Sequence, residues 1–163
     1  MVEDIVRGFG YLTLGTRLKR IGERLQADAQ KITEGAGADV QSSQYPFLAA
    51  IDHLGPLGIG ELAEAVGITQ PGATRAVNQL VRLGLLETRT SSGDQRRRIV
   101  SLTPVGKSFV AEGKAHVWPL IRAAVADLCE GLNGPLLDQL AAIEDGLSEK
   151  PLHRRVKKPG KRP

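Results

Sequence analysis

The spacing of apolar residues changes near residue 84, and this change locates the central motif of the chain. From Thr69 to Leu83 apolar residues recur every three or four positions, which predicts one helix. Its buried face is predicted to consist of Ala73, Ala76, Val77, Leu80 and Leu83. Thr69 is suited to be the N-cap, Pro71 is tolerated in the first turn, and Gly84 suits the left-handed residue that follows a helix.

A hairpin is predicted directly after this helix, because the apolar period falls to two. The expected strands are Leu85–Thr90 and Arg97–Leu102, with a polar turn at Ser91–Arg96 between them. Before the helix we expect a strand at Leu57–Ile59, a helix at Gly60–Val66 and a tight turn at Gly67-Ile68. Two helices joined by a turn and followed by a hairpin predict a winged helix–turn–helix.

The polar face of the helix at 69–83 carries no carboxylate. It consists of amide, hydroxyl and guanidinium side chains: Gln70, Thr74, Arg75, Asn78, Gln79 and Arg82. These groups match the base edges in the major groove of DNA. Residues 75–98 contain six arginines and two acids, and an arginine at a hairpin tip can reach the minor groove. The alternative is a core helix followed by a solvated turn, but cap, face, hairpin and charge agree on DNA binding.

This stretch resembles the MarR family of bacterial transcriptional regulators. The matching segments are Glu61-Leu62-Ala63, Thr74-Arg75, Leu83–Glu87, Asp94-Gln95-Arg96 and Leu102–Gly106. The resemblance covers about residues 5–148 and implies a mainly α fold with a small β-wing. In this fold a winged-helix core at about 40–103 is flanked by dimerisation helices at about 3–32 and 104–148, so that residues 1–149 form one MarR-like domain.

Motif and resemblance together predict a site for double-stranded DNA. Its residues are Thr69, Gln70, Pro71, Gly72, Thr74, Arg75, Asn78 and Gln79 in the helix, and Asp94, Arg96 and Arg97 in the wing. We expect Arg75 to contact guanine, and Arg96 to enter the minor groove while Asp94 holds it in place. Pro71-Gly72 departs from the small polar residues that many family members carry there.

The flanking segments are predicted to be long, apolar-striped helices. The first covers residues 3–32 and has its stripe at Ile5, Phe9, Leu12, Leu14, Leu18, Ile21 and Leu25. A loop follows at Thr33–Asp39, and then a helix that Ser42 or Ser43 caps and Gly55-Pro56 ends, with an apolar side of Phe47, Leu48, Ile51 and Leu54. Another helix runs from Pro104 to about Leu132 with a kink at Pro119, and a last one is centred on 136–147.

These terminal helices are too thin to be stable alone, and the simplest way to bury their stripes is a second copy of the chain. The resemblance implies the same homodimer, whose two-fold symmetry would place two recognition helices about one DNA turn, or ~34 Å, apart. The alternative is that the helices fold back on their own subunit.

Composition and charge distinguish a C-terminal segment from the rest of the chain. The 163 residues are 41% hydrophobic and fit one domain, without a run of apolar residues long enough for a membrane span. The N-terminus resembles no secretory signal, and the single cysteine, Cys129, fits a reducing cytoplasm. Residues 150–163 hold seven Lys/Arg and no acid, whereas the first 149 hold 15 Lys/Arg against 18 Asp/Glu, a net charge of −3. We therefore expect a basic, disordered tail on a mildly acidic body.

Candidate enzyme chemistry is weak throughout the chain. Gly106-Lys107-Ser108 lacks the earlier glycine of a phosphate-binding loop, and His53, His116 and His153 have no metal-box spacing. Cys129 is near Asp127 and Glu130, which would raise the pKa of its thiol and favours an inert cysteine over a redox sensor. We predict no catalytic residue, no cofactor and no metal.

The resemblance also implies a pocket for a small aromatic or phenolic effector. Tyr11, Arg17, His53 and Trp118 are candidates to line it, but a packing or surface role suits each of them, so no ligand residue is assigned. The predicted function is a cytoplasmic, homodimeric, sequence-specific regulator, a ligand-responsive repressor of a pseudo-palindromic operator. The alternatives are a winged-helix module that binds proteins and an enzyme subunit.

Overall fold

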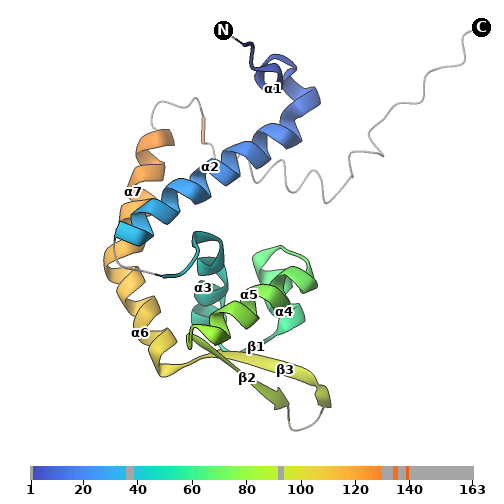
Figure 1. The fold of residues 1–163 in the computed structure, drawn as a ribbon, viewed down its shortest axis with the longest axis vertical. Coiled ribbons are helices and arrows are strands. Elements are labelled where there is room, and N and C mark those ends of the chain that lie inside the picture. The colour runs from blue at the N-terminus through green and yellow to red at the C-terminus, as the bar shows by residue number, and fades with distance from the viewer. Residues whose placement is uncertain (1, 36–38, 92–93, 130–133, 136–138, 140–163) are drawn as a thin grey trace, which may run out of the picture. The chain divides into compact units, whose positions relative to one another are not determined.

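The computed structural model describes residues 2–35, 39–91, 94–129, 134–135 and 139, and Figure 1 draws the other residues in grey. At residues 7, 35, 91, 94–97 and 129 the description covers the backbone and not the side chains. By its internal contacts the chain divides into two compact units, Met1–Arg122 and Ala123–Pro163. Apart from residue 139, the predicted helix at 136–147 lies outside the described residues, and so does the tail at 150–163.

The predicted N-terminal helix at 3–32 is wrong as a single element. The structure has α1 (Ile5–Gly8), a 3-10 turn η1 (Gly10–Thr13) and α2 (Leu14–Gly35). Gly10 has a φ of +54°, which interrupts an α-helix, and the Thr13 hydroxyl closes the turn by donating to the Val6 carbonyl over 2.6 Å.

The loop predicted at Thr33–Asp39 also begins later, because α2 runs to Gly35. Thr33 is fully buried, and its hydroxyl donates to the Gln30 carbonyl within the helix.

The predicted serine cap at Ser42 or Ser43 is wrong. A 3-10 turn η2 (Ser42–Gln44) leads into α3 (Tyr45–Leu54), whose N-cap is Gln44, but the Gln44 side chain makes no capping hydrogen bond to the helix. The Ser42 hydroxyl instead donates to the Gln26 carbonyl of α2 over 2.8 Å. The predicted end of the helix is confirmed, since Gly55 follows Leu54 with a φ of +86°.

The winged helix–turn–helix is confirmed. It consists of β1 (Leu57–Gly58), α4 (Ile59–Val66), α5 (Gln70–Arg82), β2 (Leu86–Ser91) and β3 (Asp94–Leu102). The strands form one antiparallel sheet in the order β1-β3-β2, and the hairpin of β2 and β3 extends past α4 and α5 (Figure 1). The fold is thus mainly α with a small β-wing, as predicted.

The hairpin turn is shorter than predicted, because Asp94, Gln95 and Arg96 belong to β3. Ser91 pairs with Asp94, whereas Thr90 pairs with Arg98, so the ladder is irregular between Thr90 and Ser91. The end of the hairpin lies beyond the core, where a strand needs no apolar alternation, and its polar residues therefore concealed it.

The core of the winged helix lies where α3, α4, α5, α6 and the sheet meet. Its buried apolar residues are Val40, Phe47, Leu48, Ile51, Leu62, Ala63, Ala73, Val77, Leu80, Leu85, Leu86, Val100, Leu102 and Val110. The register of the sheet places the apolar residues of its strands beside one another. Leu86 of β2 pairs with Leu102 of β3, and Val100 of β3 pairs with Leu57 of β1 and Thr88 of β2. Leu83, predicted to be buried, is instead exposed at the end of α5.

The predicted helix from Pro104 is interrupted before Pro119. It consists of α6 (Pro104–Glu112), a π-helical segment η3 (Gly113–Val117) and α7 (Trp118–Cys129). Pro119 has no N–H to donate to an i−4 carbonyl, and the π-helical segment directly before it is the irregularity that accompanies it. None of the helices in the described part of the chain is long and apolar enough to cross a membrane.

Candidate DNA-binding site

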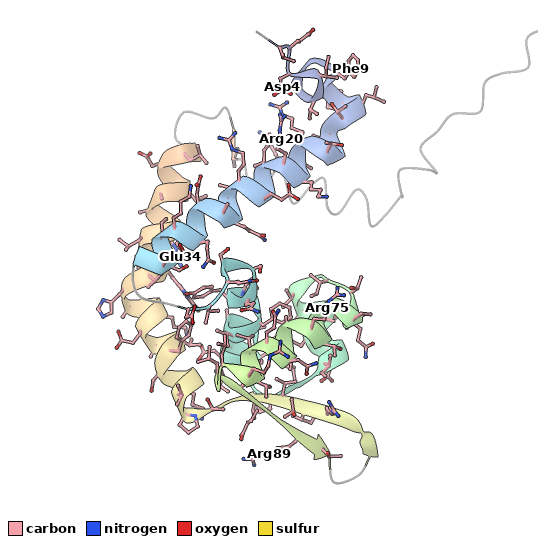
Figure 2. All side chains as sticks on the ribbon, viewed as in Figure 1. Asp4, Phe9, Arg20, Glu34, Arg75 and Arg89 are labelled. Atoms are coloured by element: carbon pink, nitrogen blue, oxygen red, sulfur yellow. The ribbon has the colours of Figure 1, made fainter. Side chains whose placement is uncertain are left out.

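The buried residues of α5 decide which of its side chains face solvent. Ala73, Val77 and Leu80 have no exposed surface, so the opposite side of the helix is open. The exposed polar residues on it are Gln70, Arg75, Asn78, Gln79 and Arg82, and Figure 2 labels Arg75. Because no Asp or Glu occurs from Ile68 to Leu86, this face is positive.

The first turn of α5 is shaped by Thr69, Pro71 and Gly72. Thr69 has extended backbone angles, and its hydroxyl oxygen accepts from the Gly72 N–H over 3.3 Å, which confirms the predicted N-cap. A Cβ on Gly72 would lie 3.2 Å from this hydroxyl oxygen, so glycine leaves room for the cap. In this structure these three residues start the helix, and the contact of Thr69, Pro71 and Gly72 with DNA stays a prediction.

Two residues predicted to face DNA already have protein partners. The Thr74 hydroxyl donates to the Gln70 carbonyl over 2.9 Å, which leaves its lone pairs as acceptors. Gln79 Oε1 accepts from the Gln44 side-chain amide over 2.5 Å. The sequence analysis missed Gln44, because no local pattern links residues 35 positions apart in the chain.

The structure places the predicted wing residues only through their backbone. Asp94, Arg96 and Arg97 lie in β3, and their side chains are outside the described part of the structure. The predicted contact between Asp94 and Arg96 therefore stays a prediction.

Two further arginines lie on the hairpin, and the site prediction omitted both although it counted the arginines of this stretch. Arg89 is exposed on β2 (Figure 2), and its guanidinium lies 3.1 Å from the Glu87 carboxylate. Arg98 is exposed on β3 opposite Thr90. Because side chains alternate along a strand, Arg89 and Thr90 point to opposite faces, and Arg98 shares the face of Thr90. Each face of the hairpin therefore carries an arginine, of which Arg89 is paired with Glu87.

A cavity of about 400 Å³ lies between α2, α3 and the start of α7. Its wall consists of Ala29, Ser42, Tyr45, Pro46, Ala49, Trp118, Ile121 and Arg122. The buried Tyr45 hydroxyl and Trp118 indole N–H have no hydrogen-bond partner among the described residues. Burial raises the pKa of the Tyr45 hydroxyl. Tyr45 also packs on Phe109.

Of the four residues proposed for an effector pocket, Trp118 lines this cavity. Tyr11 is 93% exposed, and neither Arg17 nor His53 belongs to the cavity wall.

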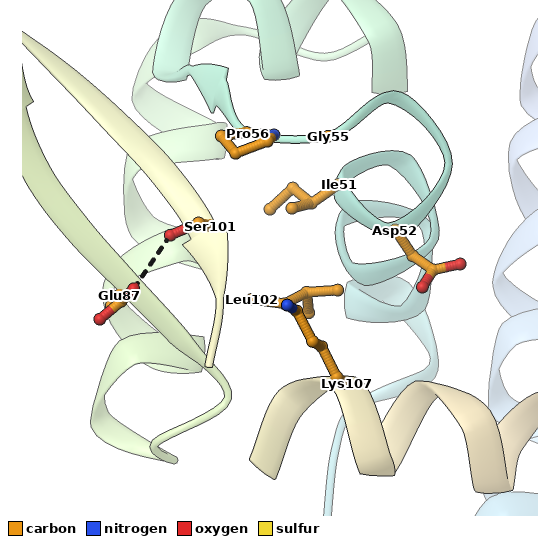
Figure 3. A pocket seen from close by; sticks show the side chains of 8 residues that line it. All are labelled: Ile51, Asp52, Gly55, Pro56, Glu87, Ser101, Leu102 and Lys107. Atoms are coloured by element: carbon orange, nitrogen blue, oxygen red, sulfur yellow. Dashed lines mark hydrogen bonds between the residues drawn. The ribbon is translucent and has the colours of Figure 1, made fainter. Parts of the chain in front are cut away.

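A second cavity of about 490 Å³ lies at the base of the wing (Figure 3). Its wall consists of Ile51, Asp52, Gly55, Pro56, Glu87, Ser101, Leu102 and Lys107. The two carboxylates have protein partners: Asp52 pairs with Lys114, and Glu87 interacts with Ser101 and Arg89. These pairs connect α3 to the π-helical segment and β2 to β3. Among the described residues, no group of three His, Cys, Asp or Glu could hold a metal ion.

A helix–turn–helix followed by a wing of this topology defines the class of winged helix–turn–helix proteins. Residues 38–97 match the model of the MarR family. Over this segment the chain resembles the MarR family of transcriptional regulators.

Solved structures agree with this assignment. A MarR family transcriptional regulator from Silicibacter pomeroyi is 29% identical, with 83% of this chain and 85% of that one covered and a TM-score of 0.57. A mutant of MarR from E. coli in complex with operator DNA is 19% identical, with coverages of 90% and 98% and a TM-score of 0.68. BpsR from Bordetella bronchiseptica, whose DNA binding is regulated by 6-hydroxynicotinic acid, is 22% identical, with coverages of 83% and 92% and a TM-score of 0.66. At such identities the last two establish the fold alone.

Proposed function

We propose that this protein is a sequence-specific DNA-binding transcriptional regulator. The observation that carries the proposal is the exposed face of α5, where Arg75, Asn78 and Gln79 lie opposite the fully buried Ala73 and Val77. Amide and guanidinium groups on a helix can make directional hydrogen bonds to base edges in the major groove. The absence of a carboxylate from Ile68 to Leu86 removes the repulsion that phosphates would otherwise meet.

The wing supplies a second, less specific contact. Arg89 and Arg98 place one guanidinium on each face of the hairpin, and Arg96 and Arg97 add two more cations to the same strand pair. A narrow minor groove has a strongly negative potential and attracts such groups. In this proposal Arg75 reads bases, Thr69, Gln70, Pro71 and Gly72 approach the backbone, and Arg96 enters the minor groove beside Asp94.

We infer a homodimer from the exposed apolar residues of the N-terminal segment. Ile5, Phe9 and Leu12 are at least half exposed, and Leu18, Ile21 and Leu25 continue this apolar surface along α2. A soluble monomer rarely exposes so many large apolar side chains on one segment. A two-fold pair would present two recognition helices to a pseudo-palindromic operator.

An effector is the finer part of the proposal. The cavity beside α3 has an apolar wall with two unpaired donors, the Tyr45 hydroxyl and the Trp118 indole N–H. A small aromatic or phenolic molecule with an acceptor group could occupy it. Binding at that position would reduce DNA affinity if it moved α3 against α5, and the protein would then act in the cytoplasm as a repressor released by its ligand.

The competing function is a winged-helix module that binds a protein partner. The pairing of Arg89 with Glu87 favours it slightly, because a paired arginine is less available to phosphates. The two functions differ in what they require from α5, since a protein-binding module needs no donors and acceptors matched to bases.

Selection from a pool of duplexes with random sequence separates these functions. Purified full-length protein is incubated with the pool, bound duplexes are amplified, and several rounds are sequenced. We expect an enriched sequence with two inverted half-sites about 10 base pairs apart, centre to centre. Enrichment of no sequence, with equal and weak binding of all duplexes, would contradict sequence-specific regulation.

A further inference from the structure

The recognition helix α5 is tied to a buried side chain that lies outside the helix–turn–helix. The Gln44 side-chain amide donates from Nε2 to Gln79 Oε1 over 2.5 Å. Gln44 is only 5% exposed, so its surroundings hold the amide in place, whereas Gln79 lies on the exposed face of α5. The bond therefore fixes the orientation of a side chain that faces solvent.

This bond limits what Gln79 can offer to DNA. A free glutamine can pair bidentately with adenine, for which its oxygen and its NH₂ group must both face the base. In this structure the oxygen of Gln79 faces Gln44, and the NH₂ group is left to make new hydrogen bonds. Since NH₂ is a donor, its partners are acceptors: N7 and O6 of guanine, O4 of thymine or N7 of adenine. Cytosine presents only a donor in the major groove and cannot pair with it.

The turn that contains Gln44 is anchored on its other side to α2. The Ser42 backbone N–H donates to Gln30 Oε1 over 2.6 Å, and the Ser42 hydroxyl donates to the Gln26 carbonyl over 2.8 Å. The Gln44 N–H donates to the Gln41 carbonyl over 2.8 Å and closes the turn. Hydrogen bonds thus lead from α2 through η2 to the DNA face of α5.

We propose that Gln44 is a positioning residue for DNA recognition, which holds the Gln79 amide as a donor and so sets a preference against cytosine at one base in each half-site. The proposal rests on the DNA-binding function proposed above. Gln44 acts through Gln79 and makes no contact with DNA itself. Because Ser42 and Tyr45 also line the 400 Å³ cavity, the turn is placed to change the orientation of Gln79 when the cavity is filled.

The test compares full-length wild-type protein with Gln44→Met, Gln79→Ala and the double variant. Dissociation constants are measured on the selected duplex and on duplexes with one base pair changed in each half-site. We expect Gln44→Met to reduce discrimination at one position by roughly 3- to 10-fold, the range of one hydrogen bond. Gln79→Ala should affect the same position, and the double variant should resemble Gln79→Ala alone.

Gln41→Met is the matched control, because Gln41 belongs to the same connection and its side chain is exposed. It should leave discrimination unchanged. Thermal unfolding at one protein concentration reports whether each variant is folded.

The outcomes separate a positioning role from a structural one. Equal weakening on every duplex by Gln44→Met would show that Gln44 only supports the fold, and it would overturn the proposal. Discrimination that stays at the wild-type value would overturn it as well. If Gln44→Met does not fold, the test rests on Gln79→Ala. A Gln79→Ala protein with the base preferences of the wild type would then overturn the proposal. A wild-type protein that selects no sequence would instead remove the DNA-binding function itself.

Discussion

Arg75 is the exposed cation nearest the start of α5, one turn beyond Pro71. We predict that Arg75→Ala weakens binding to the selected duplex by about 1–3 kcal/mol and relaxes the base preference at one position in each half-site. Fluorescence anisotropy titrations on matched and changed duplexes measure both effects. Arg24→Ala, which removes an exposed arginine of α2, is the control and should keep the preference. A uniform loss on all duplexes would make Arg75 a phosphate contact.

Gly106 has no Cβ, and this allows its backbone to lie close to the Leu85 carbonyl oxygen. A Cβ at this position would lie 2.0 Å from the Leu85 carbonyl oxygen, where α6 begins beside β2. Gly106→Ala should therefore destabilise the protein by about 1–3 kcal/mol through overpacking, measured by urea unfolding. Gly60→Ala is the matched control, because a Cβ there meets no atom within 4 Å and alanine favours the helix. Equal stability of the two variants would contradict this account of Gly106.

At the scale of elements, the wing is predicted to bind independently of the recognition helix. Arg96→Ala should weaken operator binding by about 1–3 kcal/mol while the protein stays folded. Because β3 begins at Asp94, Arg96 belongs to the strand, in the irregular part of the ladder between the pairs Ser91–Asp94 and Thr90–Arg98. Affinity equal to that of the wild type would remove Arg96 from the DNA contact, and circular dichroism checks the fold.

Element boundaries were predictable where their signals are local. The cap at Thr69, the period of Ala73, Val77 and Leu80, and the left-handed Gly84 all lie within one short stretch, and the structure has α5 there. The break at Gly10 was not predictable in this way, because the apolar stripe continues on both sides of it. The hydrogen bond from Gln44 to Gln79 was hidden for another reason, since it depends on the packing of separate elements.

At the scale of the whole molecule, the apolar N-terminal surface predicts association. Ile21→Glu should shift the protein from dimer to monomer, because it places a charge in the interface that we infer, and sedimentation velocity measures the shift. Ala27→Glu introduces the same charge at another exposed position of α2 and is the control. A dimer of unchanged stability in Ile21→Glu would exclude this surface from the interface.

The basic segment 150–163 is predicted to add affinity without sequence preference. Ending the chain at Glu149 removes seven Lys/Arg, which should lower non-specific affinity and flatten the slope of log K against log salt. Discrimination between operator and scrambled duplexes should stay equal or rise. A full-length variant with these seven residues changed to Gln separates the effect of charge from that of length. Identical slopes for wild-type and truncated protein would show that the segment has no part in DNA binding.

The π-helical segment Gly113–Val117 sets the phase of the helix that follows it. A π turn holds about one residue more than an α turn, and one residue corresponds to about 100° of rotation. Val110, before the segment, is buried in the winged-helix core, and Trp118, after it, stands against Gly113 and lines the cavity with Tyr45. If one residue of the segment were removed, the part of the helix that follows would rotate by about 100° and turn Trp118, Ile121 and Arg122 away from the cavity. The extra residue therefore lets one continuous helix serve both the core and the cavity.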